Sequence, residues 1–204
     1  MNKVDRWFTS DSHYAHKNLT KGETTWDDDS GCRDFKTVTE MNDALVNNIN
    51  AVVKPDDHLY HIGDFAFGRG DGPIIEFRNR INCKNMFLFI GNHDYRLQSH
   101  DSELRKLFTK VRMKGTLKID GLNVVFNHFP ELIWDKHHHG AIHLYGHCHN
   151  SLADKKVLDH VFHNRKCMDV GIDTHPEFRP YHFDEIKEYM DRKKVLFLDH
   201  HTKR

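Results

Sequence analysis

The sequence has no excess of charge of either sign, and its few cysteines show no pairing pattern. Its 204 residues include 30 Lys and Arg against 30 Asp and Glu, so the formal net charge is zero with neutral histidines. Such a chain has no global positive field to attract long nucleic acid, although a local basic patch is still compatible with this balance. The four cysteines form no CxxC pair, which argues against a thiolate zinc site or a thioredoxin-like motif.

Long apolar runs are also lacking. No stretch is apolar for long enough to cross a membrane, and the first residues lack the apolar core of a signal peptide. We therefore expect no membrane partner and a reducing, cytoplasmic setting. The sequence shows no internal repeat, no linker-like tract and no evidence of an obligate protein partner. A chain of this length can bury one core, so 1–204 is expected to form a single domain.

Histidine is the residue that the sequence has in excess, with 19 copies. Neutral imidazole is the commonest metal ligand in proteins, so this excess raises the expectation of a metal site. The most conspicuous histidines are the consecutive His137, His138 and His139. We expect this triplet to be a solvated loop, because it follows no predicted strand; the alternative is a role in substrate contact or metal capture.

The order of predicted elements indicates an α/β protein. Helical periodicity alternates with short apolar runs in the first half, whereas the second half is mostly strand. An Asp120-Gly121 pair predicts a hairpin turn within 115–130. Further strands are predicted at 4–10, 58–63, 85–91, 141–147, 166–173 and 194–199, and helices at 38–53, 73–81, 101–108 and 183–193. This order suits one domain with two sheets and outer helices.

Residues with metal-binding side chains recur where the predicted strands end. Strand ends in α/β sheets are where ligand sites gather, because the following loops converge there. Carboxylates, an amide and several imidazoles form a mixed oxygen and nitrogen set that suits Mn, Fe, Ni or Zn, and their number points to two ions. The residues are Asp11, His13, Asp64, Asn92, His93, Asp94, His128, His147 and His149.

Five short motifs in a fixed order carry a family resemblance. They read DSH from Asp11, GDF around Asp64, GNHD around Asn92, NH at His128 and GHCH from Gly146 to His149. In that order the set resembles the calcineurin-like metallophosphoesterases. The flanking sequence is similar to a small, single-domain bacterial and phage subgroup of predicted phosphoesterases, or phosphohydrolases. The resemblance implies a four-layer αββα sandwich with two mixed β-sheets flanked by helices.

The same resemblance implies a role for each motif residue. One divalent ion would be bound by Asp11, His13 and His149, and the other by Asn92, His128 and His147, with Asp64 bridging the two. The ions would be Mn foremost, with Fe, Ni or Zn as alternatives, and a hydroxide between them would attack phosphorus. His93 would stabilise the transition state or protonate the leaving oxygen, and Asp94 would orient its loop.

The expected function is therefore hydrolysis of a phosphodiester or phosphomonoester. The substrate would be a small phosphoester, such as a nucleotide or a nucleic-acid end. His16, Arg33 and Arg179 are candidate substrate-binding residues, since Arg binds phosphate through two parallel hydrogen bonds. Alternatives are a non-catalytic, histidine-rich metal-binding or sensor protein, a pseudoenzyme or interaction module, and a protein phosphatase on the same fold. The run after Asp64, FAFGRGD, lacks the GDxxDRG pattern of protein phosphatases.

Overall fold

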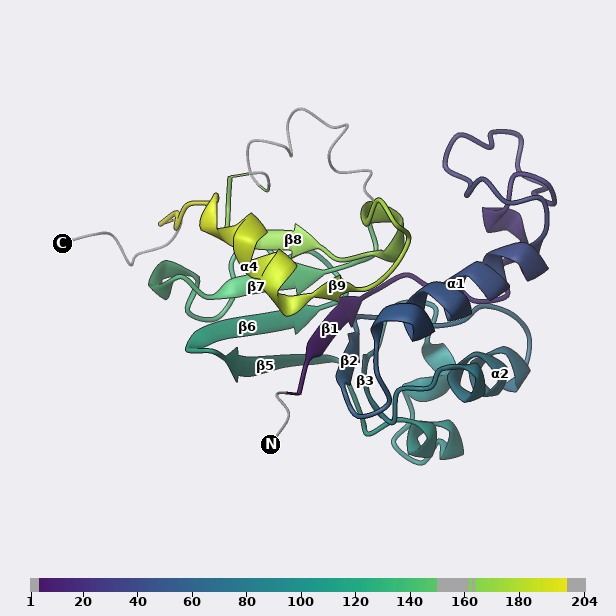
Figure 1. The fold of residues 1–204 in the computed structure, drawn as a ribbon, viewed down its shortest axis with the longest axis horizontal. Coiled ribbons are helices and arrows are strands. Elements are labelled where there is room, and N and C mark those ends of the chain that lie inside the picture. The colour runs from purple at the N-terminus through teal and green to yellow at the C-terminus, as the bar shows by residue number, and fades with distance from the viewer. Residues whose placement is uncertain (1–3, 150–161, 163, 198–204) are drawn as a thin grey trace.

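The computed structural model describes residues 4–149, 162 and 164–197, and the described strands form two sheets (Figure 1). The larger sheet has the strand order β4-β3-β2-β1-β9. Strands β1 to β4 run parallel, and β9 pairs antiparallel with β1, so the sheet is mixed. The strands are β1 Arg6–Thr9, β2 His58–His61, β3 Asn85–Phe89, β4 Lys110–Arg112 and β9 Tyr181–His182.

The second sheet has the order β5-β6-β7-β8 and is also mixed. β5 and β6 form an antiparallel hairpin, while β6, β7 and β8 run parallel. The hairpin turns at Asp120 and Gly121, both with positive φ, as a two-residue turn between twisted strands requires. The strands are β5 Lys114–Ile119, β6 Leu122–Asn127, β7 Ile142–Tyr145 and β8 Cys167–Asp169.

Within the described residues, three α-helices flank the sheets. Helix α1, Val38–Val52, begins with a capping box in which Thr37 and Glu40 each bond the other's backbone N–H. The other helices are α2, Gly72–Arg80, which has a proline in its first turn, and α4, Phe183–Asp191. Among the described residues, no helix is both long enough and apolar enough to cross a membrane.

The two faces of the larger sheet bury different cores. Leu59 of β2 packs with α1 and α2 in one apolar cluster, whereas Phe8 and Tyr60 face the second sheet in another. Phe126 of β6 stacks on both Phe8 and Tyr60, so the sheets pack face to face. Helix α4 adds Phe183, Ile186 and Met190 to this core between the sheets. The expected αββα class, with two mixed sheets flanked by helices, is confirmed.

Some predicted elements differ from the structure. The helix predicted at 101–108 is a shorter 3-10 helix, Glu103–Leu107, and Ser102 at its start makes no side-chain cap. The strand predicted at 194–199 is wrong over its described part: Lys194 forms one isolated bridge with Arg165, and residues 195–197 form no strand. Residues 198 and 199 lie outside the described residues. An apolar run forms a strand only when another strand lies beside it, and the sequence of this segment did not show whether one would.

Candidate metal centre

The site lies where five strands end. The loops after β1, β2 and β3 leave the same edge of the larger sheet, because these strands are parallel. The loops after the parallel strands β6 and β7 leave one edge of the second sheet. Within each sheet a backbone hydrogen bond joins two of these loops. Asp11 N–H, after β1, donates to the carbonyl oxygen of Gly63, after β2, and Gly146 N–H, after β7, donates to that of His128, after β6. Each loop therefore brings its polar side chains into one region.

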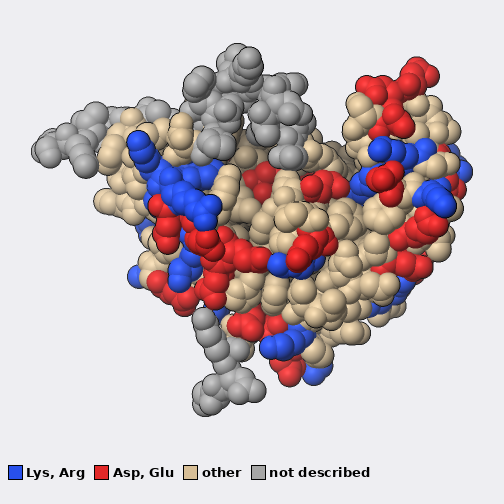
Figure 2. Space-filling view, turned by 45° about the horizontal axis from the view of Figure 1, so that its top comes forward, with Lys and Arg blue, Asp and Glu red and all other residues tan. Residues whose placement is uncertain are grey.

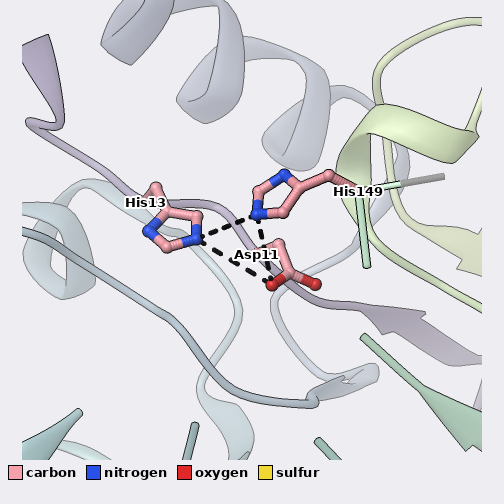
Figure 3. Close-up of side chains that lie close together, drawn as sticks. All are labelled: Asp11, His13 and His149. Atoms are coloured by element: carbon pink, nitrogen blue, oxygen red, sulfur yellow. Dashed lines mark hydrogen bonds and ion pairs between the residues drawn. The ribbon is translucent and has the colours of Figure 1, made fainter. Parts of the chain in front are cut away.

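Asp11, His13 and His149 converge in a first cluster, called here the His149 group (Figure 3). The Nε2 atoms of His13 and His149 lie 3.2 Å apart. Asp11 Oδ1 lies 3.9 Å from the first of these nitrogens and 3.7 Å from the second. One ligand atom from each residue lies within 4.8 Å of the others, so the group could hold a metal ion.

Asp64, His128 and His147 form a second cluster, the His147 group, whose ligand atoms meet the same 4.8 Å limit. Asp64 Oδ2 lies 3.3 Å from His128 Nε2. Asn92 joins this group, because its Oδ1 lies 3.0 Å from His128 Nε2 and 3.0 Å from His147 Nδ1. This group, too, could hold a metal ion.

Asp64 stands between the two groups. Its Oδ2 lies 3.5 Å from His13 Nε2 in one group and 3.3 Å from His128 Nε2 in the other. The side chain is almost fully buried, so the carboxylate is held by the protein around it. A single carboxylate oxygen in this position is within reach of a cation in either group.

The pKa values of the ligand residues show that both groups favour positive charge near their carboxylates. Burial raises the pKa of Asp11 to about 7, an effect that His149 and His128 only partly offset. Burial acts in the same direction on Asp64, but the bond and charge of His128, together with His13, hold the pKa of Asp64 well below its usual range. Burial lowers the pKa of His128, yet Asp64 and Asp11 outweigh burial and raise it to about 9. Buried carboxylates that draw protons onto neighbouring imidazoles would bind a metal cation in the same way.

The donor set fits divalent transition metals. Imidazole nitrogens, carboxylate oxygens and one amide oxygen converge, a mixture that suits Mn, Fe, Ni or Zn. No thiol belongs to either group of described residues, and burial raises the pKa of the nearby Cys148 thiol to about 12, so that thiol stays protonated. The other ring nitrogen of His13, Nδ1, is buried without a hydrogen-bond partner in the described chain, which leaves Nε2 to face the group.

The backbone at these positions lies in the left-handed region. Asp11, His13, Asp64, His147 and His149 have φ values of 55°, 46°, 56°, 70° and 44°. Residues with a Cβ rarely adopt this region, and such strain gathers at functional sites when the surrounding structure enforces it. Each of these residues lies within four positions of a strand end, so the paired strands hold its backbone in this conformation.

Asp94 fixes the loops that carry Asp64 and Asn92. Its buried carboxylate accepts backbone N–H bonds from Gly91, Asp64 and Phe65 at 2.9, 2.8 and 3.0 Å. Burial raises its pKa to about 6, although these bonds act in the opposite direction. Gly91 permits the close approach, since a Cβ there would collide with Asp64. These contacts tie the segment after β3, which carries Asn92 and His93, to the segment after β2, which carries Asp64.

Arg33 supports the His149 group from behind. Its guanidinium donates to the backbone oxygens of Asp11 and Ser12 and forms an ion pair with Asp173. Asp173 Oδ2 in turn lies 2.7 Å from His149 Nδ1. The Arg33 side chain is only 5% exposed, so it has little surface with which to contact a substrate. We therefore assign it the role of positioning Asp173 and the loop of Asp11. Asp173 follows β8 in DVGID, and an Asp after a strand end is the signal by which sequence could have found it.

The other candidate residues are also placed by the structure. His93 is exposed, its ring centroid lies 5.2 Å from that of His13, and its backbone N–H donates to Asp64 Oδ1. His16 is buried against Phe67, with ring centroids 3.7 Å apart. Arg179 pairs with Glu177 and Glu185 near the start of α4, which leaves its charge engaged there.

The expectation of a solvated histidine triplet is wrong in part. His137–His139 forms a 3-10 helix, and His137 is buried. The His137 ring lies edge-on to Trp134, and its Nδ1 lies 3.1 Å from the Trp134 carbonyl oxygen. The left-handed Lys136 begins this turn and Gly140 ends it, which turns the first histidine inward. His139 is exposed, as expected.

Comparisons with known proteins establish the fold but no family. No protein-family model matches the chain. Over 191 residues, covering 93% of each chain, it is 26% identical to an uncharacterized protein of Methanocaldococcus jannaschii. A solved protein of unknown function from Aquifex aeolicus shares the fold, with a TM-score of 0.64 and 17% identity over 91% of this chain and 99% of that one. An archaeal phosphodiesterase matches with a TM-score of 0.40 and 16% identity, over 70% of this chain and 72% of that one; this likeness is too weak to argue from.

Proposed function

We propose that the protein is a metal-dependent phosphoesterase with a dinuclear centre. The observation that supports this most is Asp64 Oδ2, which lies within 3.5 Å of an imidazole nitrogen in each of two adjacent ligand groups. Two divalent ions bound side by side, roughly 3.5–4 Å apart, polarise phosphoryl oxygens and make water a nucleophile at neutral pH. Mn is the ion we favour, with Fe, Ni or Zn as alternatives.

The residues of the chain would divide the work. Asp11, His13 and His149 would hold one ion, and Asn92, His128 and His147 the other. His93 would protonate the leaving oxygen, a role supported by its exposed ring beside His13. Asp94 would keep the loop of Asn92 and His93 in register with Asp64.

The substrate we propose is a small phosphodiester or phosphomonoester of the nucleotide type. Figure 2 shows Lys and Arg interspersed with Asp and Glu over the face drawn, which agrees with the zero net charge. A long nucleic acid would be better served by a continuous basic surface. A histidine-rich sensor would draw its ligands from the His137–His139 triplet, and the burial of His137 against Trp134 argues against it.

The test is a panel of bis(p-nitrophenyl) phosphate, p-nitrophenyl phosphate, nucleotides and cyclic nucleotides with Mn, Ni, Mg and Zn. The wild type should bind two ions per chain and turn over at least one ester. Asp64→Asn should lose turnover, while Asp56→Asn, at an aspartate whose side chain is 86% exposed, should behave as the wild type. Unchanged turnover in Asp64→Asn, or none in the wild type with every metal, would refute the proposal.

A further inference from the structure

A cavity of about 300 Å³ lies beside His93. One wall comes from the segment between β2 and α2, with Phe67 and Arg69, and from the first turn of α2, with Pro73 and Ile74. The other wall comes from the segment after β3, with His93 and Tyr95. The cavity is therefore formed by the same two loops that carry Asp64 and Asn92 into the metal centre.

Two aromatic rings connect the cavity with the His149 group. The ring centroids of Phe67 and His93 lie 5.3 Å apart, and that of His93 lies 5.2 Å from that of His13. Both Phe67 and His93 line the cavity. A phosphoryl group held at the ligand groups would thus have its leaving oxygen near His93, with the cavity next to it.

The chemistry of the walls suits a flat, apolar group. Tyr95 leaves 56% of its surface exposed, a large share for an aromatic ring. The Arg96 guanidinium carbon lies 5.6 Å from the Tyr95 ring centroid, and a terminal nitrogen of the same guanidinium forms an ion pair with Asp71. This side of the ring is therefore covered by a side chain that is itself held in place. Aromatic side chains of this kind stack on nucleobases with little preference between bases.

The edge of the cavity carries a cation. Arg69 is exposed and makes no ion pair or hydrogen bond with any residue that the structure describes. Its charge is therefore available to an anionic or electron-rich edge of a ligand. The combination of an apolar floor, an exposed ring and one available guanidinium differs from the ligand groups, which hold only imidazole, amide and carboxylate donors.

We propose that this cavity binds the planar aromatic group on the leaving side of the substrate, a nucleobase, against Tyr95 and Phe67. The inference rests on the proposed function, since it takes the phosphoryl group to lie at the two ligand groups. It goes further in naming the residues that select the substrate. The reacting ester would then be a nucleotide whose base is recognised by shape and stacking.

The experiment compares adenosine 5′-monophosphate with ribose 5-phosphate, which lacks only the base. Binding of each is measured by calorimetry to the full chain with Mn²⁺, in the wild type and in Tyr95→Ala. The wild type should bind the nucleotide at least tenfold more tightly, and Tyr95→Ala should lose most of that advantage. Tyr95→Phe, which keeps the ring, should retain it, as should Tyr189→Ala on α4.

Equal affinities in the wild type, no saturable binding of the nucleotide, or an advantage that survives Tyr95→Ala would each overturn the proposal. Because Tyr95 is exposed, its removal should leave the fold intact, which circular dichroism checks. Phosphate release during the titration is assayed separately, so that binding and turnover are read independently. A chain that binds the base but hydrolyses no ester would therefore contradict the proposed function and support the cavity assignment.

Discussion

Arg33 and Asp173, 140 residues apart in the chain, form a two-point ion pair: Arg33 Nε lies 2.7 Å from Asp173 Oδ1, and a terminal guanidinium nitrogen lies 2.9 Å from Oδ2. Asp173, held by Arg33, contacts Nδ1 of the His149 ring, and Nε2 of the same ring faces Asp11 and His13. A carboxylate on the far nitrogen of a ligand imidazole fixes its tautomer and its direction. The pair therefore presets one ligand of the His149 group.

Replacing Arg33 with lysine should weaken one ion site selectively. Lysine keeps the charge but cannot form the two-point contact, so Asp173 and His149 lose their fixed orientation. We expect the affinity of the His149 group for Mn²⁺ to fall by about 10–100-fold, the usual effect of losing such a supporting contact. Titration of Mn²⁺ followed by electron paramagnetic resonance measures it. Arg192→Lys, at a side chain 72% exposed, is the control, and two unchanged sites in Arg33→Lys would contradict the assignment.

Removal of the His93 imidazole should affect turnover and leave metal binding intact. General acid catalysis contributes about 10²–10⁴-fold in rate, and we expect His93→Ala to lose turnover in that range. Its ring belongs to neither ligand group, so both ions should still bind. His100→Ala, at another exposed histidine after β3, should keep wild-type turnover. A loss of ions in His93→Ala would make the residue a ligand instead of an acid.

Asp94→Asn should destabilise the fold. The carboxylate accepts three backbone N–H bonds, and an amide offers only one oxygen in its place. Leaving a buried N–H without a partner costs about 1–3 kcal/mol. Urea unfolding should show a loss of free energy of unfolding in that range, while the exposed Asp101→Asn should show none. Equal stability of the two variants would mean that the loop is held by other contacts.

The stabilising role of Glu185 should depend on pH. Burial opposes its ionisation, but the bond from Arg179 and the backbone N–H of His182 outweigh burial and lower the pKa of Glu185 from 4.5 to about 2. A carboxylate whose pKa is lower in the folded state stabilises the protein above the unfolded pKa, and this contribution disappears as pH falls through the folded one. Glu185→Gln should therefore lower Tm at pH 7, and the gap from the wild type should narrow between pH 4.5 and about 2. A gap independent of pH would exclude the charge as its cause.

The histidine triplet should separate into a structural residue and a surface one. His137→Ala removes a buried ring and its contact with the Trp134 carbonyl, which should cost about 1–3 kcal/mol in urea unfolding. The exposed His139→Ala should leave the free energy of unfolding unchanged and metal-dependent turnover within a few-fold of the wild type. If His139→Ala abolished turnover in a folded protein, the triplet would belong to the metal centre after all.

The sequence predicts much of this arrangement because its determinants are local. The apolar period of 38–53 is enough to predict α1, and the Asp120-Gly121 turn is enough for the β5–β6 hairpin. Parallel strands that end in Asp, Asn or His predict a shared edge, and the structure does bring those residues into two groups.

The rest depends on contacts between distant segments. From the sequence Arg33 is a candidate substrate-binding residue, and only the fold places Asp173 beside it, because no local pattern links residues 140 apart. β9 has two residues and exists only through pairing with β1. The inward turn of His137 likewise needs Trp134 and the left-handed Lys136, which composition does not reveal.

The left-handed backbone at the strand ends sets stability against function. A left-handed residue with a side chain costs about 1–2 kcal/mol relative to glycine-like freedom, so a sequence chosen for stability alone would place Gly or Asn at positions such as His13 and His149. Those same substitutions would remove the imidazoles that face Asp11. Efforts to make this fold more heat-resistant should therefore leave these turns unchanged and seek their gains elsewhere.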